Sequence, residues 1–306
     1  MTTAPRVLSL LPAATEMVAA VGMTEALVGR SHECDYPAEV RHLPIATSSR
    51  VGRPGSSGDI DKEVRRLVAE ATSLYEVRVD VLAELKPDVV VTQALCDVCA
   101  VSLDEVNAAL KEVAQTNCHV VSLEPMRLEH VFDNLQSVGT ALGREKEGAA
   151  AVQALRDRLG ALQQRTKDLA PKRVLTLEWI EPPMVGGTWM GDLIEIAGGE
   201  ALVTKPGDHA PTLTRDELYA LDPEVILIKP CGFEIERTAA EAADLRKILE
   251  PFSAIPTFVA DGNAYFNRPG PRLVESAEIL AACMHPEACA DLATQHRAAF
   301  LPLATL

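Results

Sequence analysis

Two stretches of the chain share one pattern, LAELKPDVVV at residues 82–91 and LYALDPEVIL at residues 218–227. In each stretch a helix-like segment ends before a proline, and a strand-like run dominated by Val, Ile and Leu follows. Proline cannot continue a helix, and a short apolar run is typical of a strand buried on both faces of a parallel sheet. The pattern therefore predicts a helix, a turn and a buried strand twice over, which indicates an α/β fold.

The same alternation of apolar runs and helical patterns continues along the rest of the chain. RVLSL at residues 6–10 returns as RVLTL at residues 173–177. Strands that alternate with helices indicate parallel sheets covered on both faces. The expected strands are Arg6–Leu10, Ala26–Arg30, Asp88–Thr92, His119–Leu123, Arg173–Glu178, Glu224–Lys229 and Thr257–Ala260. The expected helices are Thr15–Val21, Ile60–Glu70, Val79–Leu85, Leu103–Val113, Leu128–Leu142, Met190–Ala197, Arg215–Ala220, Ala239–Leu249 and Arg272–Met284.

The repeated patterns predict two lobes built on the same plan. Between them, residues 144–170 are rich in Ala, Leu, Gln, Arg and Glu and stop at Pro171. This composition predicts one helix of roughly 25 residues, on the order of 38 Å long. We expect an N-terminal lobe over residues 1–143, a connecting helix over 144–170 and a C-terminal lobe over 171–306. The alternative is that this helix packs inside one large domain.

Composition excludes several classes of protein. The chain has 306 residues, of which 47% are hydrophobic and 24% charged, as expected for a globular protein with a substantial core. No apolar run approaches the ~20 residues needed to cross a bilayer. The formal net charge is -15 and no cluster of Lys and Arg is present, so nucleic acid and anionic membrane surfaces are disfavoured as partners.

The N-terminal residues and the cysteines give evidence on the cellular compartment of the protein. VLSLLPAA, residues 7–14, resembles the core of a short signal peptide, but a single Arg precedes it and Pro12 interrupts it. We expect a first strand there and a helix that begins near Ala14. The seven cysteines are odd in number and lack the spacing of a disulfide scaffold, which favours a cytoplasmic location. A periplasmic chain whose signal had been removed would begin in the same way.

Candidate binding residues follow the expected strands, because open α/β sheets bind ligands beyond the carboxyl ends of their strands. Arg268 and Arg272 can pair with an anionic ligand group or form salt bridges within the lobe. His32 and His209 can act as ligand or base, or can be ordinary surface residues. The candidate ligand-binding residues are Glu33, Tyr36, Gln93, Trp179, Met184, Trp189, His209, Phe233, Asp261, Tyr265, Phe266, Arg268 and Arg272.

Four cysteines, Cys34, Cys96, Cys99 and Cys231, also follow expected strands. Cys96 and Cys99 precede SLDE at residues 102–105, a capping-box pattern that opens a helix. The dipole at a helix N-terminus lowers the pKa of a thiol that lies close to it. Four thiolates would suit zinc or an iron–sulfur cluster. The alternatives are a dithiol redox pair, a thiol bound to the cobalt of a corrinoid, or partly buried residues without a chemical role.

The order of several motifs resembles the ABC-transporter substrate-binding proteins with a rigid interdomain helix, and among them the vitamin B12 (cobalamin)-binding family. The motifs are RVLSLLPAATE at residues 6–16, DYP at 35–37, KPDVVV at 86–91, EPPM at 181–184, AGGE at 197–200, DPEVILI at 222–228 and RPGPR at 268–272. The resemblance implies two Rossmann-like lobes joined by a long helix, with a ligand in the cleft between them. It also implies corrinoid contacts from Tyr36, Met184 and the loop from Asp261 to Arg268.

We therefore expect a substrate-binding protein that holds a corrinoid, or another metal-bearing small molecule, for ABC-type uptake or intracellular delivery. The expected partners are this ligand and an ABC-transporter permease. The alternative is a cytoplasmic enzyme or metal-binding protein on the same scaffold. Its cysteines would then carry zinc, an iron–sulfur cluster or thiol chemistry.

Overall fold

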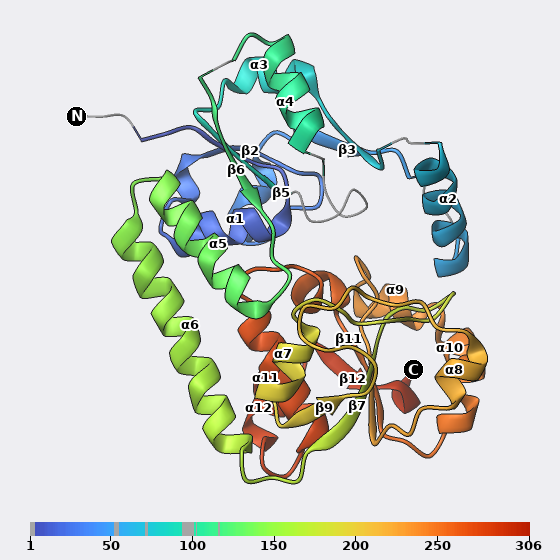
Figure 1. The fold of residues 1–306 in the computed structure, drawn as a ribbon. Helices are drawn as coiled ribbons and strands as arrows, with labels where there is room; N and C mark the ends of the chain where they lie inside the picture. The colour runs from blue at the N-terminus through green and yellow to red at the C-terminus, as the bar shows by residue number, and fades with distance from the viewer. Residues whose placement is uncertain (1–3, 52–54, 71–72, 94–100, 102, 116) are drawn as a thin grey trace. The chain divides into compact units, whose positions relative to one another are not determined.

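The computed structural model describes residues 4–306 except positions 52–54, 71–72, 94–100, 102 and 116. The chain forms two compact units, and each is an α/β lobe with a mainly parallel sheet (Figure 1). The first unit comprises residues 1–55, 59–125 and 129–154, and the second comprises residues 56–58, 126–128 and 155–306. The predicted fold class is thus confirmed, whereas the division at residues 143 and 170 stays a prediction.

The first unit is built on a parallel sheet in the order β2-β1-β5-β6. Its strands are β1 (Val7–Ser9), β2 (Leu27–Arg30), β5 (Val89–Gln93) and β6 (His119–Leu123). Two further strands, β3 (Thr47–Ser49) and β4 (Tyr75–Val77), form a separate antiparallel pair. The helical elements here are α1 (Pro12–Ala20), η1 (Thr24–Ala26), η2 (Ala38–His42), α2 (Ser57–Ala69), α3 (Val79–Leu85), α4 (Leu103–Glu112) and α5 (Leu128–Ala141).

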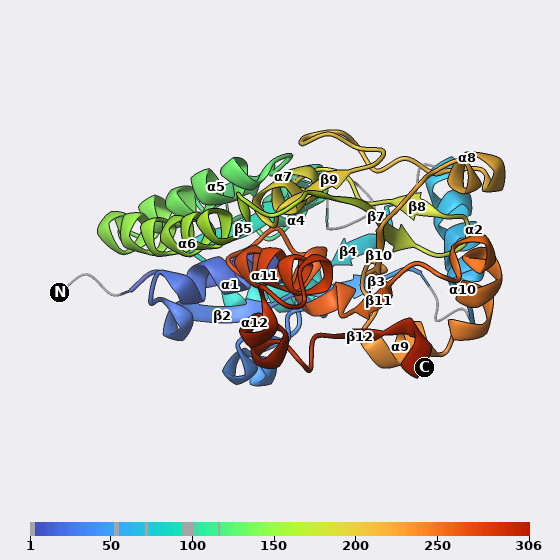
Figure 2. The same cartoon turned by 90° about the horizontal axis from the view of Figure 1, so that it is seen from below.

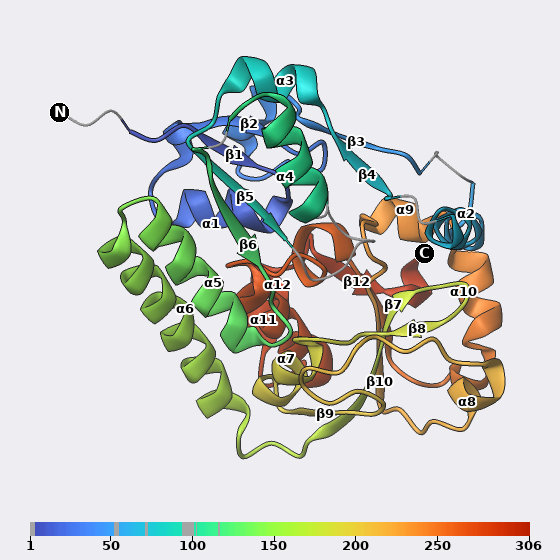
Figure 3. The same ribbon diagram turned by 45° about the horizontal axis from the view of Figure 1, so that its top comes forward.

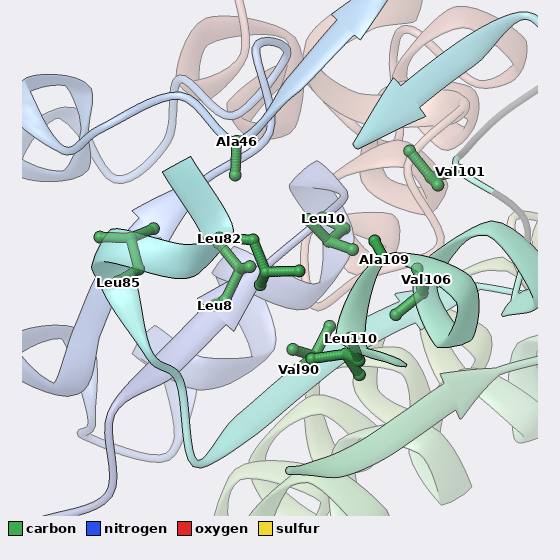
Figure 4. Close-up of a cluster of buried hydrophobic side chains, with 10 residues drawn as sticks. All are labelled: Leu8, Leu10, Ala46, Leu82, Leu85, Val90, Val101, Val106, Ala109 and Leu110. Atoms are coloured by element: carbon green, nitrogen blue, oxygen red, sulfur yellow. The ribbon is translucent and has the colours of Figure 1, made fainter. Parts of the chain in front are cut away.

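One hydrophobic cluster of the first unit lies between this sheet and helices α3 and α4. Side chains of β1 and β5 point toward apolar residues of α3 and α4 (Figure 4). Because side chains alternate along a strand, Ser9 lies on the opposite face from Leu8. The hydroxyl of Thr15, on α1, donates a 2.8 Å hydrogen bond to Ser9, so α1 covers that face. Both faces of the sheet are buried, as the apolar runs predict.

The second unit is built on a six-stranded sheet, in which β7, β10 and β11 run parallel. Its strands are β7 (Lys172–Trp179), β8 (Met184–Val185), β9 (Gly199–Ala201), β10 (Val225–Ile228), β11 (Thr257–Ala260) and β12 (Phe300–Pro302). Figures 2 and 3 show α7, α11 and α12 on one side of this sheet and α8 and α10 on the other. The helical elements are α7 (Met190–Ile196), α8 (Arg215–Tyr219), α9 (Ile235–Ala239), α10 (Ala242–Ile248), η3 (Glu250–Phe252), the π-helical turn η4 (Gly262–Phe266), α11 (Leu273–Met284), α12 (Ala290–Gln295) and η5 (Leu303–Thr305).

The long helix α6 spans Glu145–Thr166, and the first unit passes into the second within it, between residues 154 and 155. It begins one residue later and ends four residues earlier than the expected segment. In the described part of the chain, no helix is both long and apolar enough to cross a membrane.

Two expectations about helix boundaries are wrong. Helix α1 begins at Pro12 and not near Ala14, because the fixed φ angle and missing N–H of proline suit the first helical position. The helix expected over Ala239–Leu249 begins only at Ala242, as α10, and a separate short helix, α9, precedes it over Ile235–Ala239. The short strands β3, β4, β8, β9 and β12 and helix α12 were not expected, because segments this short carry little periodic signal.

Candidate functional site

The candidate site lies at the carboxyl ends of the parallel strands in the second unit. Glu178 and Trp179 end β7, Lys229 follows β10, and Asp261 follows β11. In the parallel register, Ile228 lies opposite both Leu177 and Val259, so the residues that follow these strands come together at one sheet edge. Such an edge is where open α/β sheets hold their ligands.

A buried lysine ties three of these strand-end segments together. Lys229 is fully buried, and its ammonium donates to Glu178 Oε2 at 2.8 Å and to Asn267 Oδ1 at 3.0 Å. The amide nitrogen of Asn267 in turn donates to the carbonyls of Lys229, at 2.9 Å, and Gly262, at 3.1 Å. A buried charge needs such partners, because an isolated ammonium loses its hydration without compensation. The network fixes β7, β10 and the turn η4 relative to one another.

Aromatic rings and a guanidinium stack beside this network. The rings of Trp179 and Phe233 lie 5.2 Å apart at 59°, a favourable tilted geometry. The guanidinium of Arg237, on α9, lies 4.4 Å from the centre of the Phe233 ring, within range of a cation–π interaction. The buried indole N–H of Trp179 has no hydrogen-bond acceptor among the described residues. The stack therefore combines apolar ring faces with one indole donor for which the described part of the chain supplies no acceptor.

The turn that follows β11 carries the remaining charged candidates. The carboxylate of Asp261 accepts a 2.7 Å hydrogen bond from the backbone of Ala264 and so caps η4. Burial raises the pKa of this carboxyl above its ordinary value. Arg268 is buried and donates to Asn263 at 2.9 Å, and the guanidinium of Arg272 lies 5.4 Å from the ring centre of Tyr265. These contacts hold both arginines close to the polypeptide.

Several candidate residues of this unit have mainly structural surroundings. Trp189 is buried and its indole donates a 3.0 Å hydrogen bond to the carbonyl of Phe266, which is itself fully buried. Trp189 therefore packs in the core against Phe266, the last residue of η4. Met184 is half-buried in β8, and His209 is exposed in the loop that follows β9. Their binding roles stay predictions.

In the first unit, polar residues gather after β2. The ring nitrogen Nδ1 of His32 lies 2.7 Å from the hydroxyl of Thr47, and its ring centre lies 5.5 Å from that of Tyr75. Tyr75 also donates a 3.2 Å hydrogen bond to Glu33. Burial and, less strongly, the charge of Arg30 lower the pKa of His32, which favours the neutral ring at pH 7.

The two remaining candidates of the first unit differ in exposure. Gln93 is buried at the end of β5, whereas Tyr36 is 48% exposed. A shallow hollow of about 380 Å³ lies elsewhere, between β6 and α5. Its lining contains no Asp, Glu, Lys, Arg or bulky aromatic residue, so it does not resemble the strand-end sites.

Comparison with known proteins identifies the fold family. Residues 7–256 match the family described as periplasmic binding protein. This chain belongs to that family.

Relatives of this periplasmic binding protein include proteins named for two kinds of ligand. The vitamin B12-binding protein of Pectobacterium atrosepticum is 22% identical over 280 residues, which cover 89% of this chain and 86% of that protein. The vitamin B12-binding protein BtuF of Vibrio cholerae has a similar solved structure, with a TM-score of 0.66, 18% identity and coverage of 92% of this chain and 96% of that one. A periplasmic haem-binding protein from Pseudomonas aeruginosa gives a TM-score of 0.68, with 20% identity and coverage of 93% and 94%.

The thiol hypothesis receives no support from the described part of this periplasmic binding protein. Cys34 is buried, with its sulfur 3.0 Å from the hydroxyl oxygen of Thr15, whereas Cys231 is exposed. Cys96 and Cys99 lie outside the described residues, as does Ser102 of the expected capping box. Among the residues described, no group of three or more His, Cys, Asp or Glu side chains is arranged to hold a metal ion.

Sequence reasoning missed four residues of the candidate site. Glu178 and Lys229 were assigned to the ends of strands without a role, and Asn267 and Arg237 were not singled out. A lysine directly after a wholly apolar strand is a usable signal, because a charge at the end of a buried strand requires a partner. The partner itself could not be identified, since Glu178 and Lys229 are 51 residues apart in sequence.

Proposed function

We propose that this protein is the substrate-binding component of an ABC-type uptake system and that its ligand is a metal-bearing macrocycle, a corrinoid or haem. Membership of the periplasmic binding protein family supports a binding role. The vitamin B12-binding and haem-binding relatives support the class of ligand. The sequence left two compartments open, and we favour the periplasm because the family and these structural relatives carry that description. A permease of the ABC type is the partner that this role requires.

The observation that carries the proposal is the stack of Trp179, Phe233 and Arg237 beside the strand ends of the second unit. A corrin or porphyrin ring has broad apolar faces and a periphery with polar groups. Aromatic rings match such faces, and charged or amide side chains match the periphery. The nearby turn adds Tyr265 and Arg272, which are a second pair of an aromatic ring and a guanidinium.

The test is a titration of the purified protein with cyanocobalamin and, separately, with hemin. Absorption spectra and isothermal calorimetry should both report saturable binding of one of these ligands with a stoichiometry that the two methods share. Free tryptophan and an unrelated acidic protein serve as controls for weak association of hemin with any polypeptide. Absence of saturable binding of both ligands would contradict the proposal.

A further inference from the structure

Among the described residues, the Lys229 network presents hydrogen-bond acceptors to solvent and no donors. The side chain of Lys229 is 1% exposed, whereas that of Glu178 is 20% exposed. Both hydrogen-bonding ends of Asn267 are engaged, since its oxygen accepts from Lys229 and its nitrogen donates to two carbonyls. The positive end of the ion pair is thus hidden, and the negative end reaches the surface of the candidate site.

The two carboxylate oxygens of Glu178 differ in their hydrogen bonding. Oε2 accepts from Lys229 at 2.8 Å, and no hydrogen bond to Oε1 is found among the described residues. A carboxylate only accepts hydrogen bonds, so Oε1 is a fixed acceptor. Its position is well defined, because the buried ammonium anchors the other oxygen and the backbone carbonyl of Glu178 accepts a 3.0 Å bond from Cys231.

We propose that Glu178 is a specificity-determining residue, which selects a macrocycle with amide N–H donors on its periphery over one with carboxylates. This inference rests on the proposed function and deepens it, because it chooses between the two ligand classes. The side chains of a corrinoid end in primary amides, and those of haem end in two carboxylates. An amide donates to Glu178 Oε1, whereas a carboxylate meets a like charge and finds no donor in the Lys229 network.

The decisive variant is Glu178→Gln. The side-chain oxygen of glutamine stays with the ammonium of Lys229, so the NH₂ group takes the place of Oε1. The position facing solvent then changes from an acceptor to a donor, with almost no change in shape. We expect cyanocobalamin to bind about tenfold more weakly to this variant and hemin to bind equally or more tightly, because a hydrogen bond to a charged group is lost.

The matched control is Glu181→Gln, three positions further along the chain and just beyond the end of β7. Glu181 is 51% exposed and pairs with Arg215 at 2.7 Å, outside the Lys229 network. This variant should leave both affinities unchanged. Thermal unfolding of both variants checks that each is folded, and Glu178→Asp provides a second test because it keeps the charge but withdraws the carboxylate by one methylene. We expect Glu178→Asp to keep the preference for cyanocobalamin over hemin but to weaken binding of cyanocobalamin.

The possible outcomes distinguish a failure of the role of Glu178 from a failure of the proposed function. Wild-type protein that binds cyanocobalamin more tightly than hemin, with a preference lost in Glu178→Gln, supports both. A wild-type preference for hemin, or an unchanged preference in Glu178→Gln, overturns the role of Glu178 and leaves the proposed function standing. Binding of neither ligand to the wild type overturns both.

Discussion

Glu241 caps the start of helix α2 through two hydrogen bonds from Ser57. The backbone N–H of Ser57 donates to Oε1 at 2.8 Å, and its hydroxyl donates to Oε2 at 2.5 Å. Ser57 and Glu241 both belong to the second unit. Asp192 likewise caps helix α5, because it accepts a 3.0 Å bond from the backbone of Leu128 and pairs with Arg127. In both cases, a carboxylate of the second unit satisfies the open N–H groups of a helix start.

The cap on α2 leads to a stability prediction. Glu241→Ala should lower the free energy of unfolding by about 1–2 kcal/mol, because it leaves the buried Ser57 N–H and hydroxyl without their acceptor. The salt bridge from Arg237 to Glu241, at 3.1 Å, is lost as well. Urea unfolding measures the effect. The control is Asp244→Ala, at an exposed position on α10. This variant should change the free energy of unfolding by less than about 0.5 kcal/mol. Equal losses in the two variants would contradict the assignment.

The Lys229–Glu178 pair predicts a larger loss. Lys229→Met should destabilise the protein by about 3 kcal/mol, since breaking a buried ion pair leaves one charge without its partner. Replacing both residues, as Lys229→Met with Glu178→Met, should recover much of this loss because no charge is then left behind. Denaturant unfolding of the two variants and of the exposed Lys247→Met control provides the comparison. If Lys229→Met unfolds at the same denaturant concentration as the control, the network has no structural role.

Protonation of Glu278 should make the folded protein less stable in acid. Burial acts to raise the pKa of this carboxyl, but hydrogen bonds from His296 and Arg158 outweigh it and lower the pKa below its ordinary 4.5. The pKa is lower in the folded state than in the unfolded state, so ionised Glu278 stabilises the fold above pH 4.5. This contribution is lost as the pH falls through the folded pKa.

Unfolding measured between about pH 3 and pH 7 tests this dependence. Glu278→Gln should be less stable than the wild type near neutral pH, and the difference should shrink in acid. Arg158 donates to both oxygens of Glu278 at 3.0 Å, so Arg158→Ala should show a similar but smaller convergence. A difference in stability that stays constant with pH would rule out Glu278 as the titrating group.

The two tryptophans should respond differently to substitution. Trp179→Ala should weaken binding of the preferred macrocycle by about tenfold, because an aromatic contact to the ring is lost. Trp189→Phe should leave the affinity nearly unchanged but lower the unfolding midpoint, because its hydrogen bond to the carbonyl of Phe266 is removed. Calorimetric titration and thermal unfolding of both variants separate these effects. If the two variants lose affinity equally, Trp179 has no special place in the site.

Local sequence patterns were sufficient for most of the regular structure. The strands expected at His119–Leu123 and Thr257–Ala260, and the helix expected at Val79–Leu85, agree with the structure at both ends. These elements combine a clear apolar pattern with strong stop signals. Strands β8, β9 and β12 escaped prediction because they have only two or three residues and depend on pairing with β7 or β11. The capping box at Thr214 and Glu217 has the same T-x-x-E pattern as other helix starts and could have been read in advance.

The sequence by itself determined the α/β class and the repeated plan of the two lobes, and it indicated the loops after the strands as the places for candidate binding residues. These properties follow from periodicity and from proline, which act over a few neighbouring residues. Only the tertiary structure decided that Lys229 meets Glu178 and Asn267, that Trp189 packs against η4 and that Trp179 lies against Phe233. The physical reason is that these contacts depend on the register of parallel strands, which joins residues far apart along the chain.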